Sequence, residues 1–548
     1  MTAFLVHNMA PLMFASLVVV LLIGYPAAFS LAAIGLIYGL IGIWLGLFSP
    51  DFLQALPERV YGVMSNDTLL AIPFFTFMGL ILERSGMAED LLDTIGQLFG
   101  TLRGGLAYAV IFVGALLAAT TGVVAASVIS MGLISLPIML RYGYDRRVAT
   151  GVIAASGTLA QIIPPSLVLI VMADQLGRSV GDMYEGAFIP GIALAALYAV
   201  YVFIVTLISP KSVPGLPVAD VGFREEDGSR GLPTLAILAV ASAVFGWLMM
   251  RNSSTHGADF VVLTMFNAIL FAFGVAVVNW LCERWFNFRF LSRLGQQVTF
   301  AMVPPLFLIF LVLGTIFIGL ATPTEGGAMG ATGALILAMA KRRLTWDLVR
   351  QATESTAKLS AFVVFILLGA RTFSLTFYGV DGHRWVEELL VSLPGGQIGF
   401  LAFVNIFVFF LAFFLDFFEI AFIVIPLLAA PAERLGIDLI WFGVILGVNM
   451  QTSFMHPPFG FALFYLRSVA PKESYVDRVS GKRMEGVTTG QIYWGAIPFV
   501  IIQCIMVGLV IAFPAMVMHY KGIGTGIDPN KVNIQIELPQ INAEPPKF

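Results

Sequence analysis

Apolar residues follow one another in long runs along most of the chain, and polar residues gather in short segments between them. A helix needs about 20 apolar residues to cross the hydrocarbon core of a bilayer. We expect twelve crossings, at 11–24, 26–48, 68–84, 148–173, 187–208, 232–250, 260–282, 299–320, 323–340, 358–378, 440–466 and 491–516. Two further apolar segments, 108–140 and 402–430, have small or polar centres, and we expect each to be a re-entrant hairpin. The pattern predicts an all-α integral membrane protein.

Two of the predicted crossings carry a double proline near their centre. Pro164-Pro165 lies within 148–173, and Pro457-Pro458 lies within 440–466. Proline inside a helix removes a backbone hydrogen bond and costs about 3 kcal/mol in water. Lipid offers the freed carbonyls no water, so such a break is tolerated only where it faces protein or a wet cavity. We therefore expect two broken helices that border a functional site.

The chain matches itself weakly but in order when it is shifted by about 293 residues. Residues 24–40 then lie over 321–337, 136–156 over 425–446, and 162–171 over 455–464, which superposes the two double prolines. We infer two repeats, 1–208 and 299–516, separated by an insertion at 209–298 with two extra spans and followed by a tail at 517–548. Seven crossings precede the second repeat, and this odd number predicts that it is inverted relative to the first.

Basic residues support the same topology, because Lys and Arg accumulate in cytoplasmic loops. One set of segments carries 21 of the 30 Lys and Arg residues: 141–147, 210–231, 283–293, 341–350 and 467–483, together with Arg84, Arg103 and Lys358. This distribution predicts that these loops are cytoplasmic and that both termini lie on the outer side of a cytoplasmic membrane.

Composition excludes several classes of protein. The chain is 59% hydrophobic and 11% charged, whereas a soluble domain carries about 25% charged residues. The net charge of −3 gives no reason to expect a nucleic-acid partner, and the two cysteines form no redox motif. The sequence contains no nucleotide-binding P-loop, no G-x-S-x-G turn and no metal-ligand spacing among its five histidines. We expect a transporter rather than an enzyme.

Inverted repeats with broken helices are typical of secondary transporters, in which free carbonyls bind Na⁺ and half-helix N-termini face an anionic substrate. Each predicted hairpin tip should lie beside a break and complete a cage of oxygen atoms. The candidate Na⁺ ligands are Thr120, Gly122, Ser156, Thr158, Asp416, Gly447, Asn449, Thr452 and Ser453, and the candidate substrate contacts are Thr121, Ser127, Ser166, Arg371 and His456. The alternative for the hydroxyl and amide groups is hydrogen bonding between helices.

Three other acids are candidates for a cation role. Glu419 shares an apolar run with Asp416, where an unpaired charge is costly, although a hairpin tip can reach water. Asp67 is also compatible with an interfacial position, and Glu325 with capping of the helix that follows. Arg371 has two interpretations: it extends outward to the interface, or it meets a substrate carboxylate.

Several segments together resemble the large membrane subunit of tripartite ATP-independent periplasmic (TRAP) transporters. They are LLAIPFFTFMG (69–79), ASGTLAQIIPPS (155–166), GLATPTEGGAMG (319–330), LTW (344–346) and LGVNMQTSFMHPPFG (446–460). The similarity covers nearly all of both repeats, but it does not cover 206–299.

The resemblance implies an elevator-type, Na⁺-coupled importer of organic anions in the bacterial inner membrane. It also implies two partners, a small four-helix membrane subunit and a periplasmic substrate-binding protein. MHPPFG (455–460) and GARTFSLTFYGVDG (369–382) are most similar to the branch associated with α-keto acids and related monocarboxylates. The alternative function is a proton-coupled transporter of organic anions that works without a binding protein.

Overall fold

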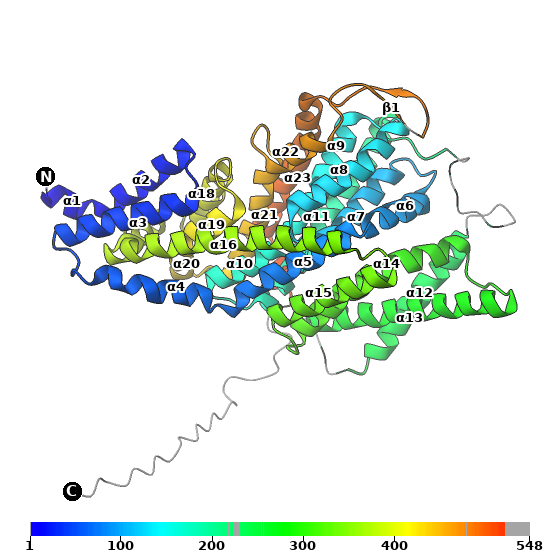
Figure 1. The fold of residues 1–548 in the computed structure, drawn as a ribbon, viewed down its shortest axis with the longest axis horizontal. Coiled ribbons are helices and arrows are strands. Elements are labelled where there is room, and N and C mark those ends of the chain that lie inside the picture. Colours follow the sequence, from blue (N-terminus) through cyan, green and yellow to red (C-terminus); the bar gives the residue numbers. More distant parts are fainter. Residues whose placement is uncertain are drawn as a thin grey trace, which may run out of the picture.

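A computed structural model describes residues 2–217, 220, 222, 225, 231–253, 255, 257–477 and 479–520. These residues form helices almost throughout, and their only strands are β1 (Tyr475–Val476) and β2 (Arg483–Met484), which pair with each other. Eight helices of the described chain are long and apolar enough to cross a membrane, or up to ten if each of two bent helix pairs is one span. The prediction of an all-α membrane protein is confirmed (Figure 1).

The number of qualifying helices is smaller than the twelve expected crossings because several crossings are divided. The broken helices fall into pieces such as Leu167–Leu176 and Leu439–Met455, which are too short to pass on their own. Helix Val124–Arg141 is long and apolar enough to count as a span, although we expected it to be an arm of a hairpin. Length and hydropathy alone do not distinguish an arm that turns back from a span that crosses.

The first predicted repeat begins with two apolar helices and ends with a long one. Its elements are α1 (Thr2–His7), α2 (Met9–Ile23), α3 (Ala27–Trp44), η1 (Phe52–Ala55), α4 (Leu56–Met64), η2 (Asp67–Leu70), α5 (Ala71–Arg84), α6 (Met87–Phe99), α7 (Gly105–Thr121), α8 (Val124–Arg141), α9 (Arg146–Thr158), η3 (Leu159–Gln161), α10 (Leu167–Leu176) and α11 (Val180–Ile208).

The second predicted repeat shows a closely similar order of elements. They are α14 (Arg293–Phe317), α15 (Pro323–Ala340), α16 (Trp346–Gly379), α17 (Gly382–Val391), α18 (Gly396–Leu411), α19 (Phe417–Ile423), α20 (Ile425–Arg434), α21 (Leu439–Met455), α22 (Phe461–Val469) and α23 (Thr489–Ala512), followed by α24 (Ala515–Met518). Of the predicted tail at 517–548, residues 521–548 lie outside the described chain.

Packing between the two halves is reciprocal. Helix α3 packs on α16, and the corresponding helices of the other half, α15 and α5, also pack together. The same reciprocal contact occurs twice more. Helix α9 packs on α23, and their counterparts α21 and α11 pack together. Helix α8 packs on α22, and their counterparts α19 and α10 pack together. Two copies related by a two-fold axis produce such pairs, so the packing supports the repeats predicted from the sequence.

Both predicted hairpins turn back on themselves. In the first, α7 and α8 are separated by two residues at the tip, and its ends meet where the Leu106 amide donates to the Tyr144 hydroxyl at 3.2 Å. In the second, α18 leads through the tip into α19 and α20, and its ends meet where Gln397 Nε2 donates to the Leu435 carbonyl at 2.6 Å. Each hairpin therefore begins and ends on the same side of the molecule.

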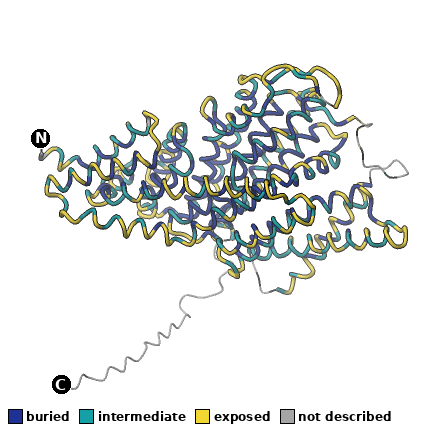
Figure 2. Tube along the Cα trace, in the orientation of Figure 1, coloured by how far each residue is buried: buried dark blue, intermediate teal, exposed yellow. Residues whose placement is uncertain are grey.

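The two double prolines predicted to break a helix do so, whereas Pro304-Pro305 lies inside the continuous helix α14. Between α9 and α10 the chain passes through η3 and the Pro164-Pro165 segment, and between α21 and α22 it passes through Pro457-Pro458. The first break is buried almost throughout, in the region where the dark blue trace of Figure 2 is concentrated, whereas Pro458 and Phe459 of the second break are exposed. The polar backbone of the first break is therefore enclosed by protein.

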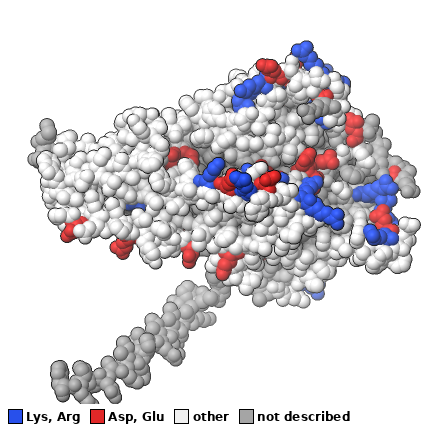
Figure 3. All heavy atoms as spheres, viewed as in Figure 1, with Lys and Arg blue, Asp and Glu red and all other residues white. Residues whose placement is uncertain are grey.

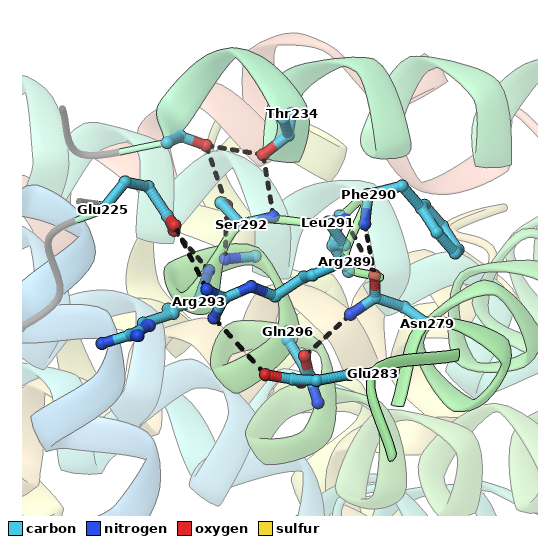
Figure 4. A network of polar contacts seen from close by, with 12 residues as sticks. Glu225, Thr234, Asn279, Glu283, Arg289, Phe290, Leu291, Ser292, Arg293 and Gln296 are labelled. Atoms are coloured by element: carbon cyan, nitrogen blue, oxygen red, sulfur yellow. Dashed lines mark hydrogen bonds and ion pairs between the residues drawn. The ribbon is translucent and has the colours of Figure 1, made fainter. Parts of the chain in front are cut away.

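The insertion contributes two helices, α12 (Leu232–Met250) and α13 (Gly257–Phe286), close to the two predicted extra spans. They pack on each other and on α14, and much of their apolar surface is exposed. A polar network joins their ends to the start of α14 (Figure 4). At its centre the buried Asn279 accepts hydrogen bonds from the amides of Phe290 and Leu291 and donates to Gln296 Oε1 at 2.8 Å. Glu225 lies 3.9 Å from Arg289, in the same network.

Most of the basic loops meet at one end of the molecule, which we call the basic end. Arg141 pairs with Asp477 at 2.9 Å, and the Asp145 amide donates to the Ser212 carbonyl, which joins three of the predicted cytoplasmic segments. On the face drawn in Figure 3, Lys and Arg gather toward the right, and large areas elsewhere are uncharged. Helix α16 starts at the basic end and rises about 50 Å along its 34 residues. Its last residues therefore mark the opposite end.

Candidate functional site

A cavity of about 500 Å³ lies where both hairpin tips meet both helix breaks. Gly122 to Ala125 come from the first tip and Phe414 and Asp416 to Glu419 from the second. Gln161, Leu167 and Val168 come from the first break, and Phe454, Phe461 and Tyr465 come from the second. Four segments that are far apart in the sequence thus enclose one space, which we call the central cavity.

Four helices begin at the wall of this cavity. Their first residues are Val124 (α8), Leu167 (α10), Phe417 (α19) and Phe461 (α22), and all four line the space. The first amides of a helix have no partner within the helix, and its N-terminus carries a partial positive charge. The central cavity is therefore suited to a small anion, although no Lys or Arg is among the residues that line it.

Asp416 and Glu419 line the cavity and cap α19. The Glu419 amide donates to Asp416 Oδ1 at 2.9 Å, and the Asp416 amide donates to Glu419 Oε2 at 3.0 Å. This reciprocal capping box satisfies two amides at the start of the helix. An ionised carboxylate offers about four acceptor positions, so both groups keep the capacity to bind a cation.

The first tip contacts the first break as predicted. Gly122 has φ +58° and caps α7, and a Cβ at this position would lie 2.9 Å from Leu167 Cγ. Ser127 is fully buried on α8. The side chains of Thr120 and Thr121 lie outside the described part of the structure, so their predicted roles stay predictions.

The three hydroxyl residues predicted at the first break form local hydrogen bonds. Ser156 donates to the Ile153 carbonyl and lies against Gly114 of α7. Thr158 donates to the Ala155 carbonyl at 2.8 Å and accepts from Gln503 Nε2 of α23 at 3.2 Å. Ser166 donates to the Gln161 carbonyl at 2.8 Å. None of the three lines the central cavity, and only the Thr158 side chain forms a hydrogen bond to another helix, so the predicted roles of the three stay predictions.

The residues predicted at the second break form hydrogen bonds both within α21 and to α18. Asn449 donates to the carbonyl and the side-chain oxygen of Asn405 in α18, at 2.8 and 3.0 Å. Thr452 donates to the Asn449 carbonyl at 2.6 Å, and Ser453 donates to the Met450 carbonyl. Gly447 lies near Leu169 and Ile162 of the first break. The two broken helices are thus in contact with each other.

His456 lies next to the second double proline and is 4% exposed. Its ring stacks on Phe413, with ring centroids 3.8 Å apart. Nδ1 is 3.1 Å from the Thr452 carbonyl, which can only accept, so Nδ1 carries a proton. Nε2 is buried without a hydrogen-bond partner among the described residues.

The remaining predicted residues lie away from the central cavity. Glu325 forms a capping box with Thr322 at the start of α15, which is the alternative expected from the sequence. Asp67 is exposed at the start of η2, and its carbonyl accepts from Thr324 Oγ1 at 2.6 Å. Arg371 is exposed on α16 and lines a second cavity.

Several glutamines were not anticipated from the sequence. Gln161 lines the central cavity and is 1% exposed, and its Oε1 has no hydrogen-bond partner among the described residues. Gln451 is fully buried, and neither end of its amide has a partner there. Gln503 donates to Tyr198 at 2.9 Å and to Thr158. The available signal was a polar amide within an apolar run, close to a double proline for Gln161 and Gln451.

The described residues contain no cluster of three His, Cys, Asp or Glu side chains that would hold a transition metal. A Na⁺ site would instead use carbonyl, hydroxyl and single carboxylate oxygens, which are the polar groups present at the two tips and breaks.

Comparisons with known proteins agree on one family. Residues 14–516 match the model of the tripartite ATP-independent periplasmic transporter, DctM component. The chain is 27% identical over 475 residues to the C4-dicarboxylate TRAP transporter large permease protein DctM of Pseudomonas aeruginosa, covering 86% of this chain and 90% of that one. It is 24% identical to the 2,3-diketo-L-gulonate TRAP transporter large permease protein YiaN of Escherichia coli, covering 84% and 89%.

Two further comparisons extend the picture. The sialic acid TRAP transporter permease protein SiaT of Haemophilus influenzae is 22% identical, covering 91% of this chain and 66% of that one. Among solved structures, the YdaH transporter of Alcanivorax borkumensis is similar with a TM-score of 0.47 and 15% identity, covering 86% and 91%. Because the family model spans nearly all of both predicted repeats, the chain belongs to the DctM family, the large permease component of TRAP transporters.

Proposed function

We propose that this chain imports a small organic anion through the central cavity, driven by Na⁺. The observation that carries the proposal is the meeting of two hairpin tips, two helix breaks and four helix N-termini around one space. The N-termini favour a negative charge, and the cavity volume of about 500 Å³ suits a ligand of a few to about a dozen heavy atoms. Relatives named for C4-dicarboxylate and 2,3-diketo-L-gulonate support a carboxylate substrate.

Sodium is the proposed coupling ion because the breaks leave backbone carbonyls without helical donors close to the tips. A hard cation accepts several oxygen atoms at once, and the two capping carboxylates supply negative charge. The proposed transport step is an elevator movement, in which the hairpins and broken helices travel together relative to α3, α5, α15 and α16. The α3–α16 and α5–α15 pairs, which interlock across the two halves, support their role as the fixed frame.

The proposed partners follow from membership of the family. They are a small membrane subunit and a periplasmic protein that delivers the substrate. The proposed location is the bacterial inner membrane, with the basic end in the cytoplasm and both termini outside. Contacts among the basic loops support one common side, and the excess of Lys and Arg identifies that side as cytoplasmic.

Proton coupling is the second candidate, because Asp416 and Glu419 both line the central cavity. The deciding experiment reconstitutes this chain with the small subunit and the loaded binding protein in proteoliposomes. Uptake is measured at one pH with either an inward Na⁺ gradient or an equal gradient of choline. We expect uptake with Na⁺ only. Uptake that persists in choline and responds to an imposed pH gradient would replace Na⁺ by protons, and uptake without the binding protein would contradict the tripartite assignment.

A further inference from the structure

A second cavity, of about 290 Å³, contains two arginines from different helices. Arg59 belongs to α4 and Arg371 to α16. Gln175 of α10 and Ser374 and Tyr378 of α16 also line it. Arg371, Ser374 and Tyr378 follow one another at the spacing of successive helical turns, so they present a polar stripe to one side of α16. We call this space the arginine cavity.

Neither arginine has an acidic partner within the described chain. No ion pair or side-chain hydrogen bond joins Arg59 or Arg371 to any described residue. Other arginines at this opposite end are paired, for example Arg178 with Glu433 and Arg434 with Glu387 at 3.1 Å. Two guanidinium groups that share a cavity without a carboxylate are suited to bind an anion, because the planar fork of each matches two carboxylate oxygens.

The arginine cavity lies along the same helices as the central cavity. Helix α16 lines the central cavity with Leu359 and Phe362 and the arginine cavity with residues from Leu367 onward. From Phe362 to Arg371 the helix rises about 13 Å toward the opposite end. Helix α19 contributes to both cavities as well, and its Phe418 contacts Phe362 edge to face at the wall of the central cavity, with ring centroids 6.3 Å apart.

We propose that the arginine cavity is a carboxylate-binding site through which a substrate passes between the outer surface and the central cavity. The link to transport rests on the proposed function of the central cavity, whereas anion binding at the two arginines does not. A phospholipid headgroup shares the relevant chemistry, a diffuse negative charge on several oxygens, so an experiment has to separate the two sources.

Chemical modification of arginine by phenylglyoxal tests the site directly. The purified permease is placed in nanodiscs of phosphatidylcholine alone or with phosphatidylglycerol, and modification of each arginine is followed by mass spectrometry with and without succinate, pyruvate or inorganic phosphate. In phosphatidylcholine we expect succinate or pyruvate to slow the modification of Arg59 and Arg371 about tenfold, because a site that is occupied about 90% of the time is open to the reagent for only about a tenth of it. Arg103, which is exposed at the basic end, is the matched control and should react at an unchanged rate.

Protection that requires phosphatidylglycerol and ignores succinate and pyruvate would overturn the proposal in favour of a lipid headgroup. Protection by phosphate as strong as by the carboxylates would contradict selectivity for carboxylate. Equal rates at Arg59 in all conditions would show that the cavity binds no anion. Because none of these outcomes requires transport, they are independent of whether the wild-type complex takes up substrate in the presence of Na⁺.

Uptake then tests the role of the site. Arg371→Gln should raise the KM for uptake about tenfold and leave kcat within about twofold, because one charge-assisted hydrogen-bonding partner is lost before the substrate reaches the central cavity. Lys358→Gln removes the same charge from an exposed position on the same helix and is the control. Arg371→Lys keeps the charge but not the fork, and it should recover only part of the affinity. A KM for Arg371→Gln equal to that of Lys358→Gln would refute the proposed passage.

Discussion

The contact between the first hairpin tip and the first helix break can be tested at Gly122. Replacing this glycine with alanine has two costs. The left-handed φ of +58° costs a residue with a Cβ about 1–2 kcal/mol, and the new Cβ would lie 2.9 Å from Leu167 Cγ, closer than real Cβ atoms approach a neighbour. The Leu167 side chain or the backbone of the tip must therefore shift.

A matched control isolates the second cost. Gly143 has φ +81° and open space where a Cβ would stand, so Gly143→Ala carries the backbone cost without the collision. We expect both variants to lower the melting temperature of the purified complex, and Gly122→Ala to lower it further, because only Gly122→Ala adds the collision. In proteoliposomes, only Gly122→Ala should raise the Na⁺ concentration for half-maximal uptake or abolish uptake, because only it displaces a wall of the central cavity.

A second substitution provides a rescue. Leu167→Ala removes the atom that the new Cβ meets, so the double variant Gly122→Ala/Leu167→Ala should recover part of the uptake lost by Gly122→Ala alone. The reasoning would be refuted if Gly122→Ala and Gly143→Ala had the same Na⁺ dependence and rate. The contact would then be a packing detail without a role in transport.

Three further predictions concern other parts of the molecule. Asp416→Ala should raise the Na⁺ concentration for half-maximal uptake at least severalfold while the complex still assembles, and wild-type Na⁺ dependence would remove Asp416 from the cation site. The hydrogen bonds from Arg141 hold the pKa of Asp477 well below its usual value. This pair therefore stabilises the fold fully above about pH 4, the pKa of an unfolded aspartate. The stabilisation is lost as the pH falls from there toward the pKa of Asp477 in the folded protein. Asp477→Asn should lower the melting temperature at pH 7 and flatten its fall between pH 5 and pH 3, and an unchanged slope would contradict the assignment. Single cysteines at 392 and 343 should react with an impermeant maleimide in intact cells only at 392, and labelling at 343 alone would reverse the topology.

Long-range order was more predictable than side-chain contacts. The double prolines that recur 293 residues apart located both breaks, because a proline removes a backbone hydrogen bond and disfavours a continuous helix. Proline alone does not decide, since Pro304-Pro305 lies inside the continuous helix α14. The hairpins were predictable from the small residues around Gly122 and the carboxylates around Asp416, which do not fit a continuous apolar span. What distinguished the two breaks was their recurrence at equivalent places of the two predicted repeats.

The direction of individual side chains was not predictable in the same way. Ser156 and Asn449 occupy equivalent positions, and each faces the first arm of its own hairpin rather than the central cavity. A helix turns by 100° per residue. If the face that a broken helix turns to the cavity is predicted one residue out of register, each side chain is assigned to the wrong neighbour. Gln161 lines the central cavity although three nearby hydroxyl residues seemed better ligands, because η3 changes the helical phase just before the prolines.

The charges around the central cavity suggest why a cation and an anion would be transported together. Four helix N-termini favour an anion, but Asp416 and Glu419 stand at one of them and repel it. Capping uses one acceptor position of each carboxylate, and a cation bound to the remaining positions would cancel the repulsion without breaking the cap. An anionic substrate would then enter favourably only after the cation has bound. Coupling of this kind needs no charged residue dedicated to the substrate, which is consistent with a lining that contains neither Lys nor Arg.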